Sequence, residues 1–244
     1  MFVTRITLDP DREHHTDAWP FTLAPVRQLA GEGLTFHKPI TFLVGENGSG
    51  KSTLVEAIAD SVKINSYGGK AGTRYASTGD KTLLGDVLTA DLTPAGLKLT
   101  TGPRTKRRGF FLRAETLFDL GRSVSGRFGF WEEDLEQQSH GEGLFTVLES
   151  MCRHPGLYLM DEPEAALSFT SCLRLVALMH RLAQSGAQII CATHSPILAA
   201  TPGADIVELG SYGLRRIEWS ELDVVDHWKR YLANPDAYLR RIIE

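Results

Sequence analysis

Gly45-Glu46-Asn47-Gly48-Ser49-Gly50-Lys51-Ser52 matches the phosphate-binding loop (P-loop) pattern GxxxxGK[ST] at every fixed position. Residues 40–44 before it form a short apolar, β-branched run that is typical of a buried strand. Residues 53–59 after it read as the first turns of a helix. A strand, a glycine-rich loop and a helix in this order predict a site that holds the phosphates of a nucleotide. The alternative is a glycine-rich turn that binds nothing.

The residue types in this loop each have a chemical reason to be there. Glycines let successive backbone N–H groups surround a phosphate, and the N-terminus of the following helix adds partial positive charge. Lys51 is expected to reach the β- and γ-phosphates, and the hydroxyl of Ser52 is expected to ligate Mg²⁺. The predicted ligands are therefore ATP and Mg²⁺, and the residues expected to contact the nucleotide are Asn47, Gly48, Ser49, Gly50, Lys51, Ser52 and Thr53.

Length and composition limit the class of protein. The chain has 244 residues, of which 42% are hydrophobic, and a formal net charge of −4. This length suits one large α/β domain or two small ones, and the mild acidity argues against a protein that binds nucleic acid with its whole surface. The sequence shows no signal peptide and no run of about 18 apolar residues. We therefore expect a cytoplasmic protein without membrane insertion.

The apolar pattern along the chain predicts an α/β fold. Strands and helices alternate in the second half, which is typical of a parallel or mixed sheet flanked by helices, and the N-terminal strands indicate an antiparallel β subdomain. We expect a single domain over residues 1–244, with a short helical insertion at about 116–142 and C-terminal helices at about 220–243. Other strands are expected at 2–8, 21–26, 34–36, on both sides of a turn at 93–96 within 83–99, and at 109–115, 157–160, 187–192, 206–209 and 214–217. Two more helices are expected at 143–152 and 173–183.

A second chemical motif lies where the strand at 157–160 ends on Asp161 and Glu162. In sheets of this kind, ligands collect at the carboxyl ends of the strands, beside the P-loop. Asp161 is expected to hold Mg²⁺, and Glu162 is expected to accept a proton from the attacking water. An apolar run before two acids is common, and it gains its meaning from the complete P-loop upstream.

Three further segments complete the set of motifs: Gln-Ser-His-Gly-Glu-Gly at 138–143, Glu-Ala-Ala-Leu-Ser at 164–168 and Thr-His-Ser-Pro at 193–196. In order and spacing, these motifs resemble those of an ABC-type ATPase domain over about residues 2–217. The resemblance implies that Ser139 and Gly141 belong to a signature that binds the γ-phosphate held by a partner subunit. It also implies that residues 164–168 contact the partner and that His194 is a switch histidine. A head-to-tail homodimer that closes on two ATP·Mg²⁺ follows from it.

The chain departs from the pattern of this family at three places. His140 replaces the first glycine of the signature, and Ser168 replaces the aspartate of the dimer-contacting segment. No glutamine follows the strand at 110–112, where the family has one. Glu115 is the expected substitute, as a contact to Mg²⁺ or to water, and its alternative is an exposed acid at a helix start.

The length of the insertion and the exact residues of two motifs indicate a biological role. The short insertion, the His-Ser-Pro switch and the Glu-Ala-Ala-Leu segment resemble the soluble branch of the family, which includes recombination, chromosome-organising and phage-defence ATPases, and also compact bacterial predicted ATPases. We therefore expect a soluble, nucleic-acid-associated or defence-related role. One alternative is an ATP-binding subunit that energises a membrane transporter, and another is a slow ATP-gated module that controls a partner.

For two groups of residues, the sequence allows two interpretations each. The basic run at 104–108 is either a solvated loop tip or a contact to the phosphate backbone of a nucleic acid. One aromatic residue among Trp19, Phe21 and Phe36 is expected to stack on the adenine, and the alternative for each is packing in the core.

Overall fold

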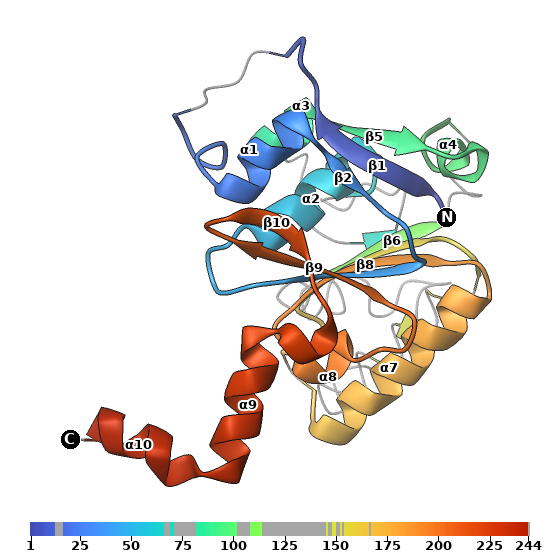
Figure 1. Ribbon diagram of the computed structural model, residues 1–244. Coiled ribbons are helices and arrows are strands. Elements are labelled where there is room, and N and C mark those ends of the chain that lie inside the picture. The colour runs from blue at the N-terminus through green and yellow to red at the C-terminus, as the bar shows by residue number, and fades with distance from the viewer. Residues whose placement is uncertain are drawn as a thin grey trace, which may run out of the picture.

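A seven-stranded sheet in the order β10-β9-β3-β8-β7-β6-β4 crosses the middle of the molecule (Figure 1). The structure is a computed structural model, and it describes residues 1–12, 17–65, 69–70, 82–101, 108–113, 145, 148–149, 152, 154–165 and 167–243. Strand β3 (Ile40–Val44) leads into the P-loop and pairs in parallel with its two neighbours, β8 (Gln188–Thr193) and β9 (Asp205–Gly210). The parallel arrangement places the carboxyl ends of these strands at one edge of the sheet.

The rest of this sheet continues from β8. Strand β7 (Leu157–Asp161) pairs in parallel with β8 and with β6 (Gly109–Arg113). The two outermost strands, β10 (Gly213–Arg216) and β4 (Gly69–Lys70), are antiparallel to their neighbours. Every residue of β3, β7 and β8 is buried, as expected for parallel strands that are covered on both faces.

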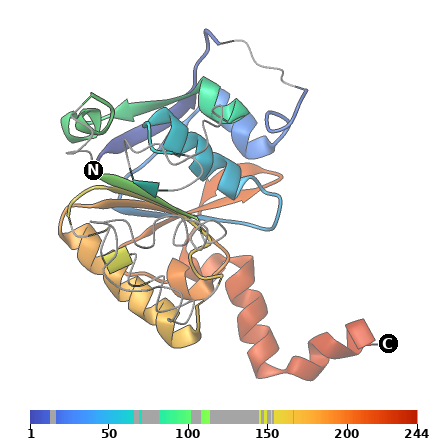
Figure 2. The ribbon, with the colours of Figure 1, turned by 180° about the vertical axis from the view of Figure 1, so that it is seen from behind.

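Helices cover both faces of the sheet because successive strand residues point to opposite sides. Leu43 and Ile190 belong to the core that includes α2 (Lys51–Ser61), whereas Phe42 and Cys191 belong to the core that includes α7 (Phe169–Gln184) and the short α8 (Pro196–Ala199). Figure 2 shows α2 on one side of the sheet and α7 on the other.

A second, antiparallel sheet has the order β2-β1-β5 and packs over α2 (Figure 1). Its strands are β2 (Leu34–Thr35), β1 (Val3–Leu8) and β5 (Leu88–Leu92). The buried side chain of Gln188 joins the two sheets, since its Oε1 accepts from the backbone N of Phe2 at 2.7 Å and of Val3 at 2.8 Å, and its Nε2 donates to the carbonyl of Val3 at 2.8 Å. The start of β8 is thereby fixed to the N-terminal strand.

The chain ends in helices that leave the sheet. A short 3₁₀ turn (Trp219–Glu221) leads to α9 (Asp223–Ala233) and α10 (Pro235–Ile243), which extend away from the rest of the molecule (Figure 1). Among the residues that the structure describes, no helix is long and apolar enough to cross a membrane.

The fold class predicted from the sequence is confirmed: an α/β fold with a mostly parallel mixed sheet and an antiparallel second sheet. The prediction of a strand at 21–26 is wrong, because helix α1 (Ala24–Gly31) begins there. Pro25 lies in its first turn, where the missing N–H would have no partner anyway, and Val26 and Leu29 are buried. The predicted insertion at 116–142 lies outside the described residues, and so does most of the predicted helix at 143–152, of which Phe145, Leu148 and Glu149 are helical.

The prediction for residues 83–99 is only partly right. It is confirmed for β5, but α3 (Leu83–Val87) precedes that strand and α4 (Pro94–Thr101) follows it. The expected turn at 93–96 is the start of α4, because the hydroxyl of Thr93 accepts from the backbone N of Gly96 at 3.1 Å and Pro94 occupies the first helical position. Thr93 and Pro94 do end the preceding element, as expected, but they begin a helix and not a turn between two strands.

Candidate functional site

The P-loop connects β3 to α2, and its backbone depends on glycine. Gly48 and Gly50 have φ angles of 80° and 95°, in the left-handed region that glycine adopts without steric cost. Gly50 is also packed, since a Cβ atom there would lie 2.9 Å from Cδ1 of Leu23. Lys51 is the first residue of α2, so the N-terminal N–H groups of the helix lie at the loop.

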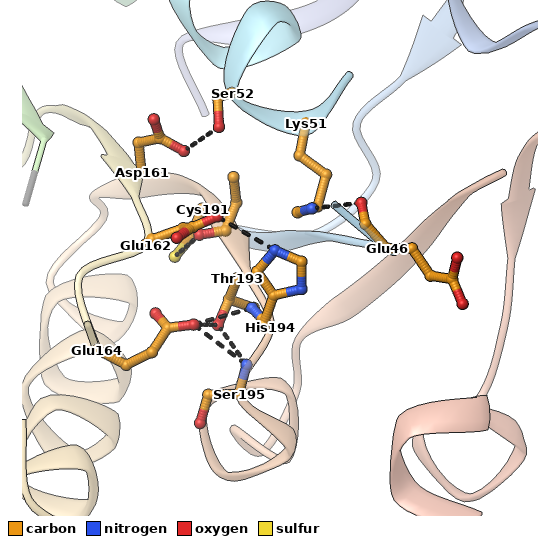
Figure 3. Close-up of polar contacts among 11 residues, drawn as sticks. Glu46, Lys51, Ser52, Asp161, Glu162, Glu164, Cys191, Thr193, His194 and Ser195 are labelled. Carbon is orange, nitrogen blue, oxygen red and sulfur yellow. Dashed lines mark hydrogen bonds and ion pairs between the residues drawn. The ribbon is translucent and has the colours of Figure 1, made fainter. Parts of the chain in front are cut away.

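Lys51 is a buried cation inside this loop, with 4% of its surface exposed. Its Nζ donates to the carbonyl oxygen of Glu46 at 2.9 Å (Figure 3). Burial lowers the pKa of Lys51, while the nearby carboxylates of Glu162, Asp161 and Glu164 act in the opposite direction. The hydroxyl of Ser49 is buried and has no hydrogen-bond partner in the described part of the chain. A buried cation and an unpaired donor in one loop fit an anionic phosphate group.

Ser52 and Asp161 meet across the loop and the end of β7. The Ser52 hydroxyl donates to Oδ1 of Asp161 at 2.8 Å (Figure 3). In the described ranges, no group of three or more His, Cys, Asp or Glu could hold a metal ion. Mg²⁺ commonly uses one or two protein oxygens together with water and substrate phosphates. The hydroxyl and the carboxylate therefore fit Mg²⁺ brought in with a nucleotide.

Arg113 is a residue of this region that sequence reasoning missed. It ends β6 directly beside Asp161, its partner in the strand register. One guanidinium nitrogen lies 2.9 Å from Oε1 of Glu56 on α2, and Nε lies 4.0 Å from Oδ2 of Asp161. The signal in the sequence was a basic residue at the end of a buried strand, and an arginine there keeps the Asp161 carboxylate next to a positive charge.

Glu162 and His194 form a close pair where β7 and β8 end. Oε1 of Glu162 lies 3.1 Å from Nε2 of His194, and both side chains are partly exposed (Figure 3). Glu162 has a φ of 47°, which is uncommon for a residue with a side chain and stores strain of roughly 1–3 kcal/mol. Its backbone N donates to the carbonyl of Ala192 at 3.0 Å, which holds the strained turn against β8. A carboxylate and an imidazole at this distance are groups that can accept and donate protons.

Glu164 is the second residue that sequence reasoning missed as part of the site. From the sequence, Glu164 is expected only to belong to a segment that contacts a partner. In the structure its Oε1 accepts hydrogen bonds from Thr193, His194 and Ser195, the residues that follow from the end of β8 (Figure 3). Its only signal in the sequence was an acid three residues after Asp161.

Several predicted residues lie outside the described part of the chain: Glu115, Ser139, His140, Gly141 and residues 104–107 of the basic run. Phe21 and Phe36 are 7% and 3% exposed and pack in the core, as their alternative reading stated. Trp19 is 61% exposed. Ser168 caps α7, because its hydroxyl accepts from the backbone N of Ser171 at 3.2 Å.

Known structures with the same fold include ATP-binding cassettes. The cbiO1 protein of Clostridium perfringens, described as part of the ABC transporter complex cbiONQ, superposes with a TM-score of 0.50 at 16% identity, covering 98% of this chain and 99% of that one. A structure titled "An inward-facing conformation of a putative metal-chelate type ABC transporter" gives a TM-score of 0.52 at 13% identity, covering 95% of this chain and 89% of that one. At these identities the likeness shows that this chain has the same fold as the two structures.

Comparisons of sequence match parts of this chain to two family models and most of it to ABC transporters. Residues 22–76 match a family described as "AAA domain", and residues 143–200 match one described as "AAA domain, putative AbiEii toxin, Type IV TA system". ABC transporter G family member 1 of Arabidopsis thaliana is 30% identical over 216 residues, which are 80% of this chain and 28% of that protein. ABC transporter G family member 21 of Dictyostelium discoideum is 22% identical over 228 residues, which are 80% of this chain and 15% of that protein.

These relatives bear on the role expected from the sequence. The chain spans 28% of the length of the Arabidopsis relative and 15% of the Dictyostelium one, and both are named ABC transporters. The comparisons therefore favour the transporter alternative over the soluble branch to which the sequence details pointed.

Proposed function

We propose that this chain is an ABC-type ATPase domain that binds ATP with Mg²⁺ and hydrolyses it to energise a membrane transporter. The observation that carries the proposal is the convergence of five side chains at one edge of the sheet: Lys51, Ser52, Asp161, Glu162 and His194. The first two come from the P-loop and the start of α2, and the others from the ends of β7 and β8.

Binding is the task of the P-loop side. The N–H groups at the start of α2 and the ammonium of Lys51 neutralise the phosphates of ATP. Ser52 and Asp161 are the residues that would hold Mg²⁺, which supplies further neutralisation of the phosphate oxygens when bound. Lys51 exchanges its bond to the Glu46 carbonyl for bonds to phosphate, so the buried cation stays paired in both states.

The chemical step is the task of Glu162 and His194. A water oxygen forms a bond to the γ-phosphorus, the bond from that phosphorus to the bridging oxygen breaks, and ADP leaves. Glu162 accepts the proton that the water loses, and the imidazole of His194, 3.1 Å from that carboxylate, orients the water and the carboxylate. Phosphate release by the purified chain, absent without Mg²⁺, is the direct test of hydrolysis.

A homodimer completes the proposed site. Two copies hold two ATP·Mg²⁺ head to tail, with Ser139 and Gly141 of each copy facing the P-loop of the other. ATP then favours the closed dimer, because only ATP offers a γ-phosphate to both copies. Light scattering on a Glu162→Gln variant measures this: the mass doubles with ATP·Mg²⁺, whereas a monomer that binds ATP without changing mass contradicts it.

Coupling to a transporter is supported by the names of the relatives and by the fold shared with cbiO1. The proposal puts the domain at the cytoplasmic face of a membrane, docked on membrane-spanning subunits. The test is isolation of the tagged chain from detergent-solubilised membranes of its own cells. We expect a membrane protein at a fixed ratio that raises the ATPase rate. A fully active chain that never sediments with membranes contradicts the proposal.

A second candidate function is control of a protein or nucleic-acid partner by slow ATP binding and hydrolysis. The match of residues 143–200 to a family described as "AAA domain, putative AbiEii toxin, Type IV TA system" favours it. In that case DNA or the partner protein, rather than a membrane protein, stimulates turnover. Loss of DNA stimulation in an Arg107→Glu/Arg108→Glu variant would support the nucleic-acid form, and absence of DNA binding at low salt would remove it.

A further inference from the structure

The carboxylate of Glu164 holds the segment that carries His194. Its Oε1 accepts from three donors: the hydroxyl of Thr193 at 2.5 Å, the backbone N of His194 at 2.8 Å and the backbone N of Ser195 at 3.1 Å (Figure 3). The donors lie about 30 residues away in the sequence and on a different strand end. One side-chain atom therefore ties the turn after β7 to the segment after β8.

These hydrogen bonds hold the backbone beyond the point where the pairing of β8 with β3 ends. Thr193 is the last residue of β8 in register with β3, so the backbone N–H groups of His194 and Ser195 lie beyond the ladder. Carboxylate acceptors form stronger hydrogen bonds to N–H groups than neutral acceptors do. Ser195 then starts α8, since its hydroxyl accepts from the backbone N of Leu198 at 3.3 Å. The backbone of His194 is thus fixed on both sides.

The same turn carries the other member of the reacting pair. Glu162 is held by its N–H bond to Ala192, and the backbone N of Ala165 donates to the carbonyl of Glu162 at 3.1 Å. The backbone N of Leu167 donates to the carbonyl of Glu164 at 2.8 Å. Glu162 and His194 therefore lie on two loops that Glu164 joins, and their side chains are 3.1 Å apart.

We propose that Glu164 is a positioning residue for hydrolysis, which holds the imidazole of His194 within reach of the Glu162 carboxylate. The role rests on the proposed ATPase function. Glu164 acts through His194 and does not itself touch the nucleotide. An error of about 1 Å in the placement of a catalytic group can lower a rate by about 10²-fold, so the joint has a measurable effect.

Two variants separate the hydrogen bonds of Glu164 from its charge. Glu164→Gln keeps an oxygen that can accept from all three donors, and its amide nitrogen takes the place of Oε2, which is buried and has no hydrogen-bond partner among the described residues. Glu164→Ala removes the acceptor. We expect kcat to fall by roughly 10²-fold in Glu164→Ala and by less than about 10-fold in Glu164→Gln, with KM and ATP affinity nearly unchanged in both.

A double variant tests whether Glu164 acts through His194. If it does, Glu164→Ala/His194→Ala turns over as slowly as His194→Ala alone, whereas a general structural effect multiplies the two losses. Amide hydrogen exchange of residues 193–195 gives a readout without turnover, and it should accelerate in Glu164→Ala and not in Glu164→Gln. Glu221→Ala is the matched control, because Glu221 also accepts a backbone N–H, at 3.1 Å from Glu218, but on the exposed turn before α9.

The outcomes are distinct. If Glu164→Ala does not fold, Glu164→Asp replaces it, since it keeps the charge and shortens the reach by one methylene. Turnover equal to wild type in folded Glu164→Ala, or in Glu164→Asp where it replaces that variant, overturns this role of Glu164 and leaves the ATPase proposal intact. A wild-type chain that binds ATP·Mg²⁺ without any turnover overturns both.

Discussion

The P-loop and the Glu162–His194 pair lie at the same edge of the sheet and are built in opposite ways. The P-loop is one continuous stretch whose shape comes from glycines at 48 and 50 and from the start of α2. The pair is assembled from two strand ends about 30 residues apart, held together by Glu164. The shape of such a loop can be predicted from adjacent residues, whereas the Glu164 contacts that place the proposed catalytic pair arise only on folding.

Glu162→Gln should separate ATP binding, which belongs to the P-loop, from hydrolysis, which belongs to the Glu162–His194 pair. The amide cannot accept the proton, so we expect kcat to fall by roughly 10²–10⁴-fold. Affinity for ATP should stay within about threefold, because the binding energy comes from the P-loop. Steady-state phosphate release and equilibrium binding of a fluorescent ATP analogue measure the two quantities. The exposed Glu218→Gln serves as a control that changes neither.

Lys51→Ala should impair the P-loop, and therefore both ATP binding and turnover. Loss of the buried cation removes a contact to the phosphates in both the bound and the reacting state, so we expect kcat/KM to fall by about 10²–10³-fold, and affinity to fall as well. Lys38→Ala is the matched control, since Lys38 is exposed and donates to the carbonyl of Ala204, away from the P-loop. Unchanged affinity in Lys51→Ala would mean that the P-loop is not the phosphate site.

Ser52→Ala should change the metal requirement rather than the nucleotide site as a whole. Removal of one oxygen ligand should raise the Mg²⁺ concentration for half-maximal turnover by roughly 10-fold or more. Ser61→Ala at the other end of the same helix removes a hydroxyl that donates to the carbonyl of Ile58, so it should leave the Mg²⁺ titration unaffected. Equal titrations for the two variants would remove Ser52 from the proposed metal site.

The smallest effects concern backbone strain. Gly50→Ala should lower the free energy of unfolding by about 1–2 kcal/mol, because alanine is unfavourable at a φ of 95° and its Cβ would press on Leu23. Glu162→Gly should raise it by about 1 kcal/mol, because glycine relieves the strain at a φ of 47° while turnover is lost. Denaturant unfolding of both variants measures this. Destabilisation by Glu162→Gly would show that the side chain stabilises the turn.

Much of this architecture was predictable from the sequence, for physical reasons that differ between regions. The strands at β3, β7 and β8 are continuous apolar runs, and the P-loop has a fixed pattern, so both were found. Residues 21–26 were predicted to be a strand because the proline in the first turn of α1, Pro25, is also compatible with an extended chain. Glu164 and Arg113 were missed because their partners are distant in the sequence, and a single acid or base near a strand end does not reveal those partners.

The nucleotide that the protein retains after incubation with ATP distinguishes binding from hydrolysis in a single measurement. Wild type and Glu162→Gln are each incubated with radiolabelled ATP and Mg²⁺, separated from free nucleotide, and the bound nucleotide is identified by chromatography. The account predicts ADP on the wild type and intact ATP, in similar amount, on Glu162→Gln. A variant that retains no nucleotide, or that converts ATP to ADP as fast as wild type, would contradict the division of this site into a binding loop and a separate catalytic pair.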